Sequence, residues 1–313
     1  MYDENSSEGE YMNINQNQFE LLCYIEREGG KRIPQRQMAE TLDLSLGSIN
    51  TILNDLVEYG LISVNEYREV QITGYGLKTL EPYRVKRAVI LAAGFSDRLI
   101  PISINTPAPL IRVHGVPMIE RLLDAIKMAG IPEVIIVRGY LKEQFETLKQ
   151  KYKEIKFIDN PFYTESNNIS SAWLAKHYLP GAYVMEADLV VNNPGVIRKY
   201  EFSSNYLGVL KKTTDDWCFE VKRGIIHKIS VGGDNSYQMK GISYWDRKDG
   251  NRLVKCIDDV WKQPGGREKY WDEVPLQIYS NDFQVRIRAC EEKDVKEIDT
   301  FKELKEIDPI YGM

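Results

Sequence analysis

The segment from Arg87 to Val113, RAVILAAGFSDRLIPISINTPAPLIRV, has residue types and spacing that suit the binding of phosphate groups. An apolar strand ending at Leu91 runs into the small-residue turn Ala92-Ala93-Gly94, and Arg98 follows. Backbone N–H groups of such a turn can face an anion, and small side chains let the main chain approach it closely. A guanidinium can bind phosphate oxygens through two parallel hydrogen bonds. We therefore expect Leu91 to Gly94 to contact a nucleoside triphosphate, with Arg98 on its β- and γ-phosphates.

Three carboxylates are placed where they could hold a divalent cation. Asp188 follows the apolar residues Tyr183-Val184-Met185, and a carboxylate at a strand end faces the ligand crevice of an α/β sheet. Glu297 and Asp299 lie two residues apart, on the same side if the chain is extended. A nucleoside triphosphate carries several negative charges, which a cation held by carboxylates would offset. The alternative is that Asp188 is a turn residue or a helix cap.

Other catalytic patterns are missing from the sequence. It contains no Walker A, HExxH or Ser/His/Asp arrangement, and its three histidines show no ligand spacing. A covalent nucleophile is not required, because a phosphate oxygen of an acceptor can attack in line. The cysteines are isolated from one another, which indicates reduced thiols and a cytoplasmic protein; they are Cys23, Cys218, Cys256 and Cys290.

Composition indicates a water-soluble protein with room for two domains. The chain has 313 residues and a formal net charge of −5. No apolar run approaches the roughly 20 residues of a membrane span, so we expect no membrane partner. The polar, acidic N-terminus is neither a signal peptide nor a basic transit peptide, and we expect residues 1–13 to be disordered.

Residues 14–82 have the pattern of a winged helix-turn-helix domain. A first amphipathic helix ends at Gly29-Gly30, and a second covers roughly Gln35–Leu42. Ser45 can cap a third helix that Gly60 stops. Two wing strands and a closing helix follow, at Leu61–Val64, Glu69–Thr73 and Gly76–Leu80. The stretch from Ile33 to Val64 resembles winged-helix regulators over its whole length.

DNA is a possible partner of this domain, but its charge is poorly matched to a polyanion. Residues 1–80 contain six Lys/Arg and thirteen Asp/Glu. The third helix, which would enter a major groove, contains Asp55 and Glu58 and no basic residue. The alternative is a winged helix reused for protein contact, for example in a homodimer.

From Arg87 onward, strands alternate with helices, which predicts an α/β fold with a mixed, mostly parallel sheet. The EPYRVK junction is too short for a flexible tether. We expect strands at 87–92, 133–138, 155–158, 182–187 and 206–210. We expect helices at 117–129, 141–152 and 170–179. Ligands of such folds bind at the carboxyl ends of the strands.

The opening segment strongly resembles the motif L-A-A-G-x-G-[ST]-R…P-K-x-L of the sugar-phosphate and phosphocholine nucleotidyltransferases. The resemblance to bacterial phosphocholine cytidylyltransferases extends over nearly all of residues 87–306. Six further segments match in order: RGYLKEQFETLKQKY at 138–152, NPFYTESNNISSAWLAKHYL at 160–179, MEADLVV at 185–191, GISYWD at 241–246, KYWDEV at 269–274 and KEIDTFKEL at 296–304. The resemblance implies a Rossmann-like nucleotidyltransferase fold for residues 87–306, behind a small winged-helix domain.

The same resemblance implies roles for particular residues. It places Mg²⁺ on Asp188 and Asp299, sometimes with Glu297, and puts Glu186 behind these ligands. It implies CTP as the nucleotide, and the candidates for contacts with the base and ribose are Gly139, Tyr140, Asn168 and Ser171. The implied catalytic residues are Arg98 and Asp188.

The acceptor implied by the resemblance is phosphocholine or a similar amino-alkyl phosphate or phosphonate. A quaternary ammonium is best held by aromatic faces with a carboxylate nearby, whereas a primary ammonium would depend more on Asp246 or Asp272. The candidate binding residues are Trp217, Tyr244, Trp245, Tyr270, Trp271 and Asp272. Core packing is the alternative for each aromatic, since Trp217, Phe219 and Val221 alternate like one buried strand face.

Two positions depart from the family motif. Ser96 stands at the second glycine, and Ala108 stands where the family has its lysine. Loss of a lysine from the α-phosphate could cost several kcal/mol of transition-state stabilisation. Arg112 or Arg138 could replace it. Two functions therefore remain open: a Mg²⁺-dependent cytidylyltransferase, and a ligand-sensing regulator built from a weakened transferase and a winged helix.

Overall fold

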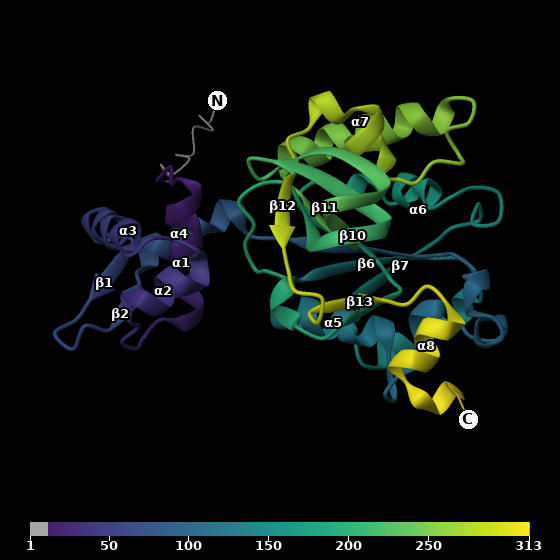
Figure 1. Cartoon of the computed structure of the whole chain (residues 1–313), viewed down its shortest axis with the longest axis horizontal. Helices are drawn as coiled ribbons and strands as arrows, with labels where there is room; N and C mark the ends of the chain where they lie inside the picture. Colours follow the sequence, from purple (N-terminus) through teal and green to yellow (C-terminus); the bar gives the residue numbers. More distant parts are fainter. Residues whose placement is uncertain (1–11, 313) are drawn as a thin grey trace, which may run out of the picture. The chain divides into compact units, whose positions relative to one another are not determined.

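The structure is a computed structural model that describes residues 12–312 (Figure 1). The chain divides into two compact units, Met1–Arg84 and Val85–Met313. Of the segment expected to be disordered, residues 1–11 lie outside the described part. Among residues 12–312, every helix is too short or too polar to span a bilayer. All four cysteines are free.

The first unit has the helices and wing predicted from the sequence. Asn15 caps its first helix through reciprocal hydrogen bonds with Gln18, both of 3.0 Å. Ser45 caps the third helix by accepting from the Ser48 N–H at 3.0 Å. The elements are α1 Gln16–Glu28, α2 Gln35–Leu42, α3 Leu46–Glu58, β1 Ile62–Val64, β2 Val70–Ile72 and α4 Gly74–Leu80. Their apolar faces share one core that includes Phe19, Leu22, Met38, Ile49, Leu53 and Leu56.

The second unit is built on a seven-stranded sheet within the described residues, in the order β10-β12-β11-β8-β3-β6-β7. Strands β8, β3, β6 and β7 are parallel neighbours, and β11 pairs antiparallel with β8. The sheet is thus mixed and mostly parallel, as predicted. The strands are β3 Arg87–Ala92, β6 Glu133–Arg138, β7 Ile155–Asp159, β8 Ala182–Glu186, β10 Asn205–Lys222, β11 Ile225–Trp245 and β12 Arg286–Ala289.

Helices cover both faces of this sheet, as Figure 1 shows. Helix α5 (Met118–Met128) packs on one face through Leu122 and Ile126. Helices α6 (Ile169–Leu174) and α7 (Arg247–Lys262) cover the other face. Burial on both sides explains why the central strands are continuous apolar runs rather than alternating ones.

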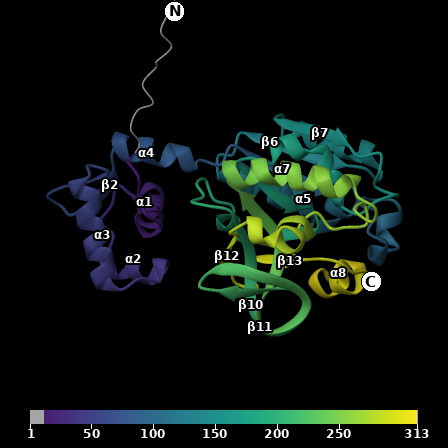
Figure 2. The same ribbon diagram turned by 90° about the horizontal axis from the view of Figure 1, so that it is seen from above.

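The two longest strands, β10 and β11, form a hairpin that extends beyond the sheet. Figure 2 shows this hairpin as a curved ribbon. Its register shifts between Thr214 and Trp217 and again at Cys218, so the ribbon contains irregular pairing. Such bulges bend a strand and redirect its side chains.

Short elements complete the unit. Strands β9 (Leu189–Val191) and β13 (Val295–Glu297) pair antiparallel. Helix α8 (Phe301–Ile307) follows β13 in the chain. A second small sheet joins β4 (Arg112–Val113) to β5 (Val116–Pro117).

Two predicted helices have a different form. The segment expected at 141–152 is a 3₁₀ helix over Lys142–Gln150, in which the buried residues Phe145 and Leu148 are three apart. That spacing places both on one side of a three-residue turn, which favours 3₁₀ geometry. The segment expected at 170–179 divides into α6 and a 3₁₀ turn, Lys176–Tyr178.

Candidate active site

One cavity of about 650 Å³ lies at the carboxyl ends of the parallel strands. Its walls come from the turn after β3, the segment between β7 and α6, the end of β8, the β10–β11 hairpin and the chain after β13. Strand ends of a parallel sheet leave backbone groups and side chains free to contact a ligand. This is the location expected from the strand–helix alternation.

The predicted phosphate-binding turn forms part of the cavity wall. Leu91, Ala92, Ala93, Gly94 and Arg98 all line it. A Cβ atom built on Gly94 would meet no atom within 4 Å, so this glycine faces open space. The turn therefore leaves room for a ligand against its backbone.

Ser96 occupies the position of the second motif glycine in a left-handed conformation, with φ of 56°. This region costs an ordinary L-residue roughly 1–2 kcal/mol, whereas glycine adopts it readily. The loop thus has at Ser96 a conformation that glycine adopts readily.

Ala108 also lines the cavity, although it is almost fully buried and packs with Leu99 and Ile111. Neither arginine proposed to replace the missing lysine is part of the lining. Arg138 bonds to Asp159 and Glu146, each at 2.8 Å, and Arg112 donates to the Gly115 carbonyl. Among residues 12–312, Arg98 is the only basic side chain that lines this cavity.

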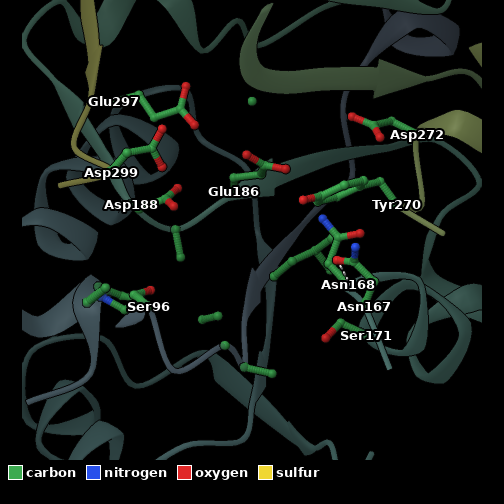
Figure 3. Close-up of a pocket in the computed structure, with 18 of the residues that line it drawn as sticks. Ser96, Asn167, Asn168, Ser171, Glu186, Asp188, Tyr270, Asp272, Glu297 and Asp299 are labelled. Atoms are coloured by element: carbon green, nitrogen blue, oxygen red, sulfur yellow. Dashed lines mark hydrogen bonds between the residues drawn. The ribbon is translucent and has the colours of Figure 1, made fainter. Parts of the chain in front are cut away.

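Four carboxylates meet at one end of the cavity, in what we call the carboxylate cluster: Glu186, Asp188, Glu297 and Asp299 (Figure 3). The pairing of β9 with β13 sets Glu297 opposite Leu189, and the Ile298 N–H donates to the Asp188 carbonyl at 3.1 Å. Residues more than 100 positions apart are brought together in this way.

The carboxylates raise one another's pKa. Burial, followed by the charge of Asp299, raises the pKa of Asp188 to about 6. Burial and then Asp188 raise the pKa of both Glu186 and Glu297 well above the usual range. For Asp299 burial also raises the pKa, while Arg98 opposes that shift. A bound cation would stabilise the ionised form of these carboxylates, because it offsets their mutual repulsion.

The donor set fits a divalent metal ion. Glu186, Asp188 and Glu297 each offer one oxygen, and these atoms lie within 4.8 Å of one another. Oδ1 of Asp188 is buried and has no hydrogen-bond partner among the described residues. Hard oxygen ligands of this kind suit Mg²⁺. Glu186, which the resemblance implies to lie behind the ligands, is close enough to offer one of these three oxygens.

Asp299 and Arg98 form an ion pair of 2.8 Å across the mouth of the cluster. Arg98 lies in the turn after β3, and Asp299 follows β13. The pair joins the expected phosphate-binding arginine to an expected metal ligand.

The opposite wall is polar and carries amide and hydroxyl groups. Asn168 and Ser171 line it, as expected. Oδ1 of Asn168 accepts from the Trp271 N–H at 2.9 Å, and Nδ2 of Asn160 donates to the hydroxyls of Ser170 and Ser171. These bonds fix the wall before any ligand binds.

Gly139 and Tyr140 do not line this cavity, and their expected contact with the nucleotide stays a prediction. Both line a smaller neighbouring pocket. Tyr140 donates its N–H to the Ala93 carbonyl, and a Cβ on Gly139 would lie 2.8 Å from that same oxygen. The two residues support the phosphate-binding turn from behind, because the chain approaches it too closely for a side chain.

Three of the six predicted acceptor-binding residues line the cavity: Trp217, Tyr270 and Asp272. The other three lie in the core, and their assignment is corrected. Tyr244 packs on Tyr183 in one core, while Trp245 and Trp271 pack edge to face in the other. Neither face of β11 is open there. Asp246 caps α7 and is also absent from the lining among the described residues.

Sequence reasoning missed several lining residues. Asn160 follows β7 directly, and its place at a strand end could have indicated it. Tyr206, Asp216 and Met239 lie within the long hairpin, where strand alternation is interrupted by register shifts. Nothing local in the sequence marks them.

Comparisons with known proteins agree with this geometry. Residues 88–201 match the family of MobA-like NTP transferase domains, and residues 14–63 match the winged helix-turn-helix DNA-binding family. The 2-aminoethylphosphonate cytidylyltransferase of Lancefieldella rimae is 35% identical over 228 residues, 72% of this chain and 92% of that protein. The choline-phosphate cytidylyltransferase of Haemophilus influenzae is 31% identical over 223 residues, 70% and 95% of the two chains.

Solved structures give the same result. The CTP:phosphocholine cytidylyltransferase of Streptococcus pneumoniae superposes with a TM-score of 0.68 at 31% identity, covering 72% of this chain and 99% of that one. The inositol-1-phosphate CTP transferase of T. maritima, at 15% identity and a TM-score of 0.58, shares the fold. The chain therefore belongs to the nucleotidyltransferase family that contains the choline-phosphate and 2-aminoethylphosphonate cytidylyltransferases, and it carries a winged helix-turn-helix domain as well.

Proposed function

We propose that this enzyme transfers CMP from CTP to phosphocholine or a related amino-alkyl phosphate or phosphonate and releases pyrophosphate. The observation that carries the proposal is a single cavity with a phosphate-binding turn, a carboxylate cluster and an aromatic–carboxylate corner. The printed activities of the relatives support this choice of nucleotide and acceptor. The free cysteines support a cytoplasmic location.

In this proposal the triphosphate lies against the turn from Leu91 to Gly94, where open space adjoins the backbone. Arg98 leaves Asp299 and binds phosphate oxygens instead. The polar wall formed by Asn168 and Ser171 accepts the base and ribose. Hydrogen-bonding groups that are already fixed lose little freedom when the nucleotide binds.

Asp188 and Glu297 would hold Mg²⁺, with Glu186 or Asp299 completing the donor set. When bound, the ion offsets the charge that develops on the phosphates. The chain's own part is to keep these carboxylates together, which the β9–β13 pairing does.

The acceptor's phosphate or phosphonate oxygen attacks the α-phosphorus in line. A new P–O bond forms while the bond from the α-phosphorus to the bridging oxygen breaks, and pyrophosphate leaves with that electron pair. Trp217, Tyr270 and Asp272 bind the amino end, so that the attacking oxygen points toward the α-phosphorus.

The test is a screen of nucleoside triphosphates against amino-alkyl phosphates and phosphonates, with pyrophosphate release in Mg²⁺ as the readout. We expect turnover with CTP and an amino-alkyl acceptor, and its loss in Asp188→Ala. Binding of CTP without turnover on any such acceptor contradicts the proposal.

A second candidate function is a ligand-sensing regulator. The match of residues 14–63 to a DNA-binding family and the alanine at position 108 favour it. The assembled carboxylate cluster favours the enzyme, because a sensor has no need of metal ligands. A regulator must form a salt-dependent complex with a specific DNA sequence, which we would test at low salt on the DNA upstream of its own gene, with and without CDP-choline.

A further inference from the structure

The phosphate-binding turn continues into a loop over residues 95–105, which we call the Arg98 loop. Burial holds this loop only in part. Leu99 packs in a core, whereas Ile104 is 50% exposed. The hydroxyl of Ser103 is buried and has no hydrogen-bond partner among residues 12–312. Other contacts must therefore supply part of the order of this loop, since local stability follows the number of buried apolar contacts.

Tyr140, which lies two residues after β6, contacts this stretch of chain at three points. Its N–H donates to the Ala93 carbonyl at 3.0 Å, just before the loop. Its ring meets the ring of Phe95 edge to face, with centroids 4.8 Å apart. Its hydroxyl donates to the Ile104 carbonyl at 2.6 Å. One residue thus joins the beginning of the Arg98 loop to its end.

Gln144 adds a second bond at the same end of the loop. It lies in the 3₁₀ helix that follows Tyr140, and its Nε2 donates to the Asn105 carbonyl at 2.8 Å. Two consecutive peptide groups, those of Ile104 and Asn105, are therefore held from one segment. Neither Tyr140 nor Gln144 is among the described residues that line the cavity. Their effect on a ligand there would be exerted through the loop.

The Arg98 loop carries the basic side chain that a triphosphate needs. The side chain of Arg98 is 63% exposed and is paired with Asp299. An exposed ion pair of this kind contributes little to stability, so it does not fix the loop by itself. In the proposed function this pair also breaks when Arg98 binds phosphate. The bonds from Tyr140 and Gln144 do not involve Arg98, so they can hold the loop during this exchange.

We propose that Tyr140 and Gln144 are positioning residues for the triphosphate. They fix the Arg98 loop and so strengthen binding of the β- and γ-phosphates rather than of the base. The inference rests on the proposed function, and it gives Tyr140 a role different from the base or ribose contact that the resemblance implies. The two roles differ in the part of the nucleotide that they affect.

The first experiment measures the binding of CTP, inorganic pyrophosphate and CMP in Mg²⁺ by calorimetry. It compares the full chain with Tyr140→Phe, which keeps the ring and loses one hydrogen bond, and with Gln144→Leu. We expect the Kd of CTP and of pyrophosphate to rise about three- to tenfold in each variant, the scale of one hydrogen bond, with the Kd of CMP unchanged.

Other outcomes contradict the inference. Equal weakening of CTP and CMP in Tyr140→Phe would indicate a contact with the base or ribose, and it overturns the role in positioning. Unchanged binding of CTP or of pyrophosphate in Tyr140→Phe overturns it as well. Unchanged binding in Gln144→Leu overturns the part assigned to Gln144.

Tyr152→Phe is the matched control. The hydroxyl of Tyr152 donates to Asp124 at 2.8 Å, so this variant also loses a phenol hydrogen bond in the same unit. Tyr152 is buried and is not among the described lining residues. We expect its Kd values for all three ligands to equal those of the parent. The same loss of CTP affinity as in Tyr140→Phe would reflect a general loss of stability and overturns the inference.

If the chain binds no CTP, the proposed function fails, and hydrogen exchange of the full chain without ligand still tests the inference. The N–H groups of Leu99, Ile100 and Ile104 are hydrogen-bonded within the loop, so their exchange rates report its opening. We expect these amides to exchange about three- to tenfold faster in Tyr140→Phe than in the parent or in Tyr152→Phe. Equal rates in the parent and in Tyr140→Phe overturn the role of Tyr140.

Discussion

The two ends of the cavity are both acidic, but they hold their carboxylates differently. In the cluster, Asp188 has a buried oxygen without a hydrogen-bond partner in the described chain, and Glu297 lies within reach of it. At the other end, which we call the acceptor corner and which is lined by Trp217, Tyr270 and Asp272, the Asp272 carboxylate accepts a hydrogen bond from the phenol of Tyr206. Several carboxylate oxygens without hydrogen-bond partners, held close together, suit a small divalent cation. A single carboxylate that is already held by one hydrogen bond suits a monovalent cationic group.

The comparison shows how one residue type serves two tasks in one cavity. Crowding within the cluster comes from the pairing of β9 with β13, which puts several negative charges together. At the acceptor corner, Tyr206 and Asp272 come from segments more than 60 residues apart, and a single hydrogen bond joins their side chains. The variants described next separate the two ends.

The largest effect is expected at the cluster. Asp188→Ala should lower kcat by about 10³-fold or more with every acceptor, because the developing phosphate charge loses its stabilisation. Pyrophosphate release is the measurement. The control is Glu220→Gln, an exposed carboxylate on β10 outside the described cavity lining. Residual turnover within tenfold of the parent would show that the cluster is not catalytic.

A smaller effect separates metal affinity from acceptor affinity. Glu297→Gln should raise the Mg²⁺ concentration needed for half-maximal rate by about 10- to 100-fold, since one donor of the cluster is weakened. Asp272→Asn should leave that concentration unchanged while raising the acceptor KM. To distinguish the two variants, bound metal would be removed with a chelator and activity measured as Mg²⁺ is added back. A similar rise in the required Mg²⁺ concentration in both variants would mean that the two ends of the cavity do not act separately.

The acceptor corner should show its own pH dependence. Burial raises the pKa of Asp272 to about 6; the Tyr206 hydrogen bond opposes this shift and neighbouring Glu273 adds to it. Because protonation removes the charge that an ammonium needs, the acceptor KM should rise about tenfold per unit as the pH falls below about 6. In Asp272→Asn this rise of the acceptor KM at low pH should be absent. The pH dependence that comes from titration of the acceptor's own phosphate should remain in both enzymes. Identical profiles would rule out Asp272 as the counter-ion.

The smallest effect concerns the missing motif lysine. Ala108→Lys should raise turnover a few-fold by adding a positive charge at the cavity wall. The same change should lower stability by about 1–3 kcal/mol, because position 108 packs tightly with Leu99 and Ile111. Ala108→Met controls for length without charge. Equal rates for the two variants would show that no cation is required at this position.

The parts of the site that the sequence predicts are those governed by local geometry. The turn from Leu91 to Gly94 follows a strand, and Asp188 ends another, so their place at the cavity follows from the alternation of strands and helices. Glu297 and Asp299 both line the cavity, as their spacing of two residues predicts. Their roles as ligands stay predictions.

The aromatic residues could not be assigned in this way. Tyr244 and Trp245 are adjacent on a strand, so they point to opposite faces, and both faces are covered by cores. Only the tertiary structure shows that Tyr206 reaches Asp272, 66 residues away. That Glu186 lies within reach of Glu297 is equally invisible in the sequence, because this distance depends on how β13 pairs with β9.

Because the carboxylate cluster needs β13 to pair with β9, it cannot be completed until a late stage of synthesis of the chain. The phosphate-binding turn and Glu186 leave the ribosome more than 100 residues before Glu297 and Asp299. A nascent chain can form the parallel strands early, since N-terminal parts fold first. The carboxylate cluster stays incomplete until residue 299 has been made, so the growing polypeptide has all four carboxylates only after the whole parallel part of the sheet has been synthesised.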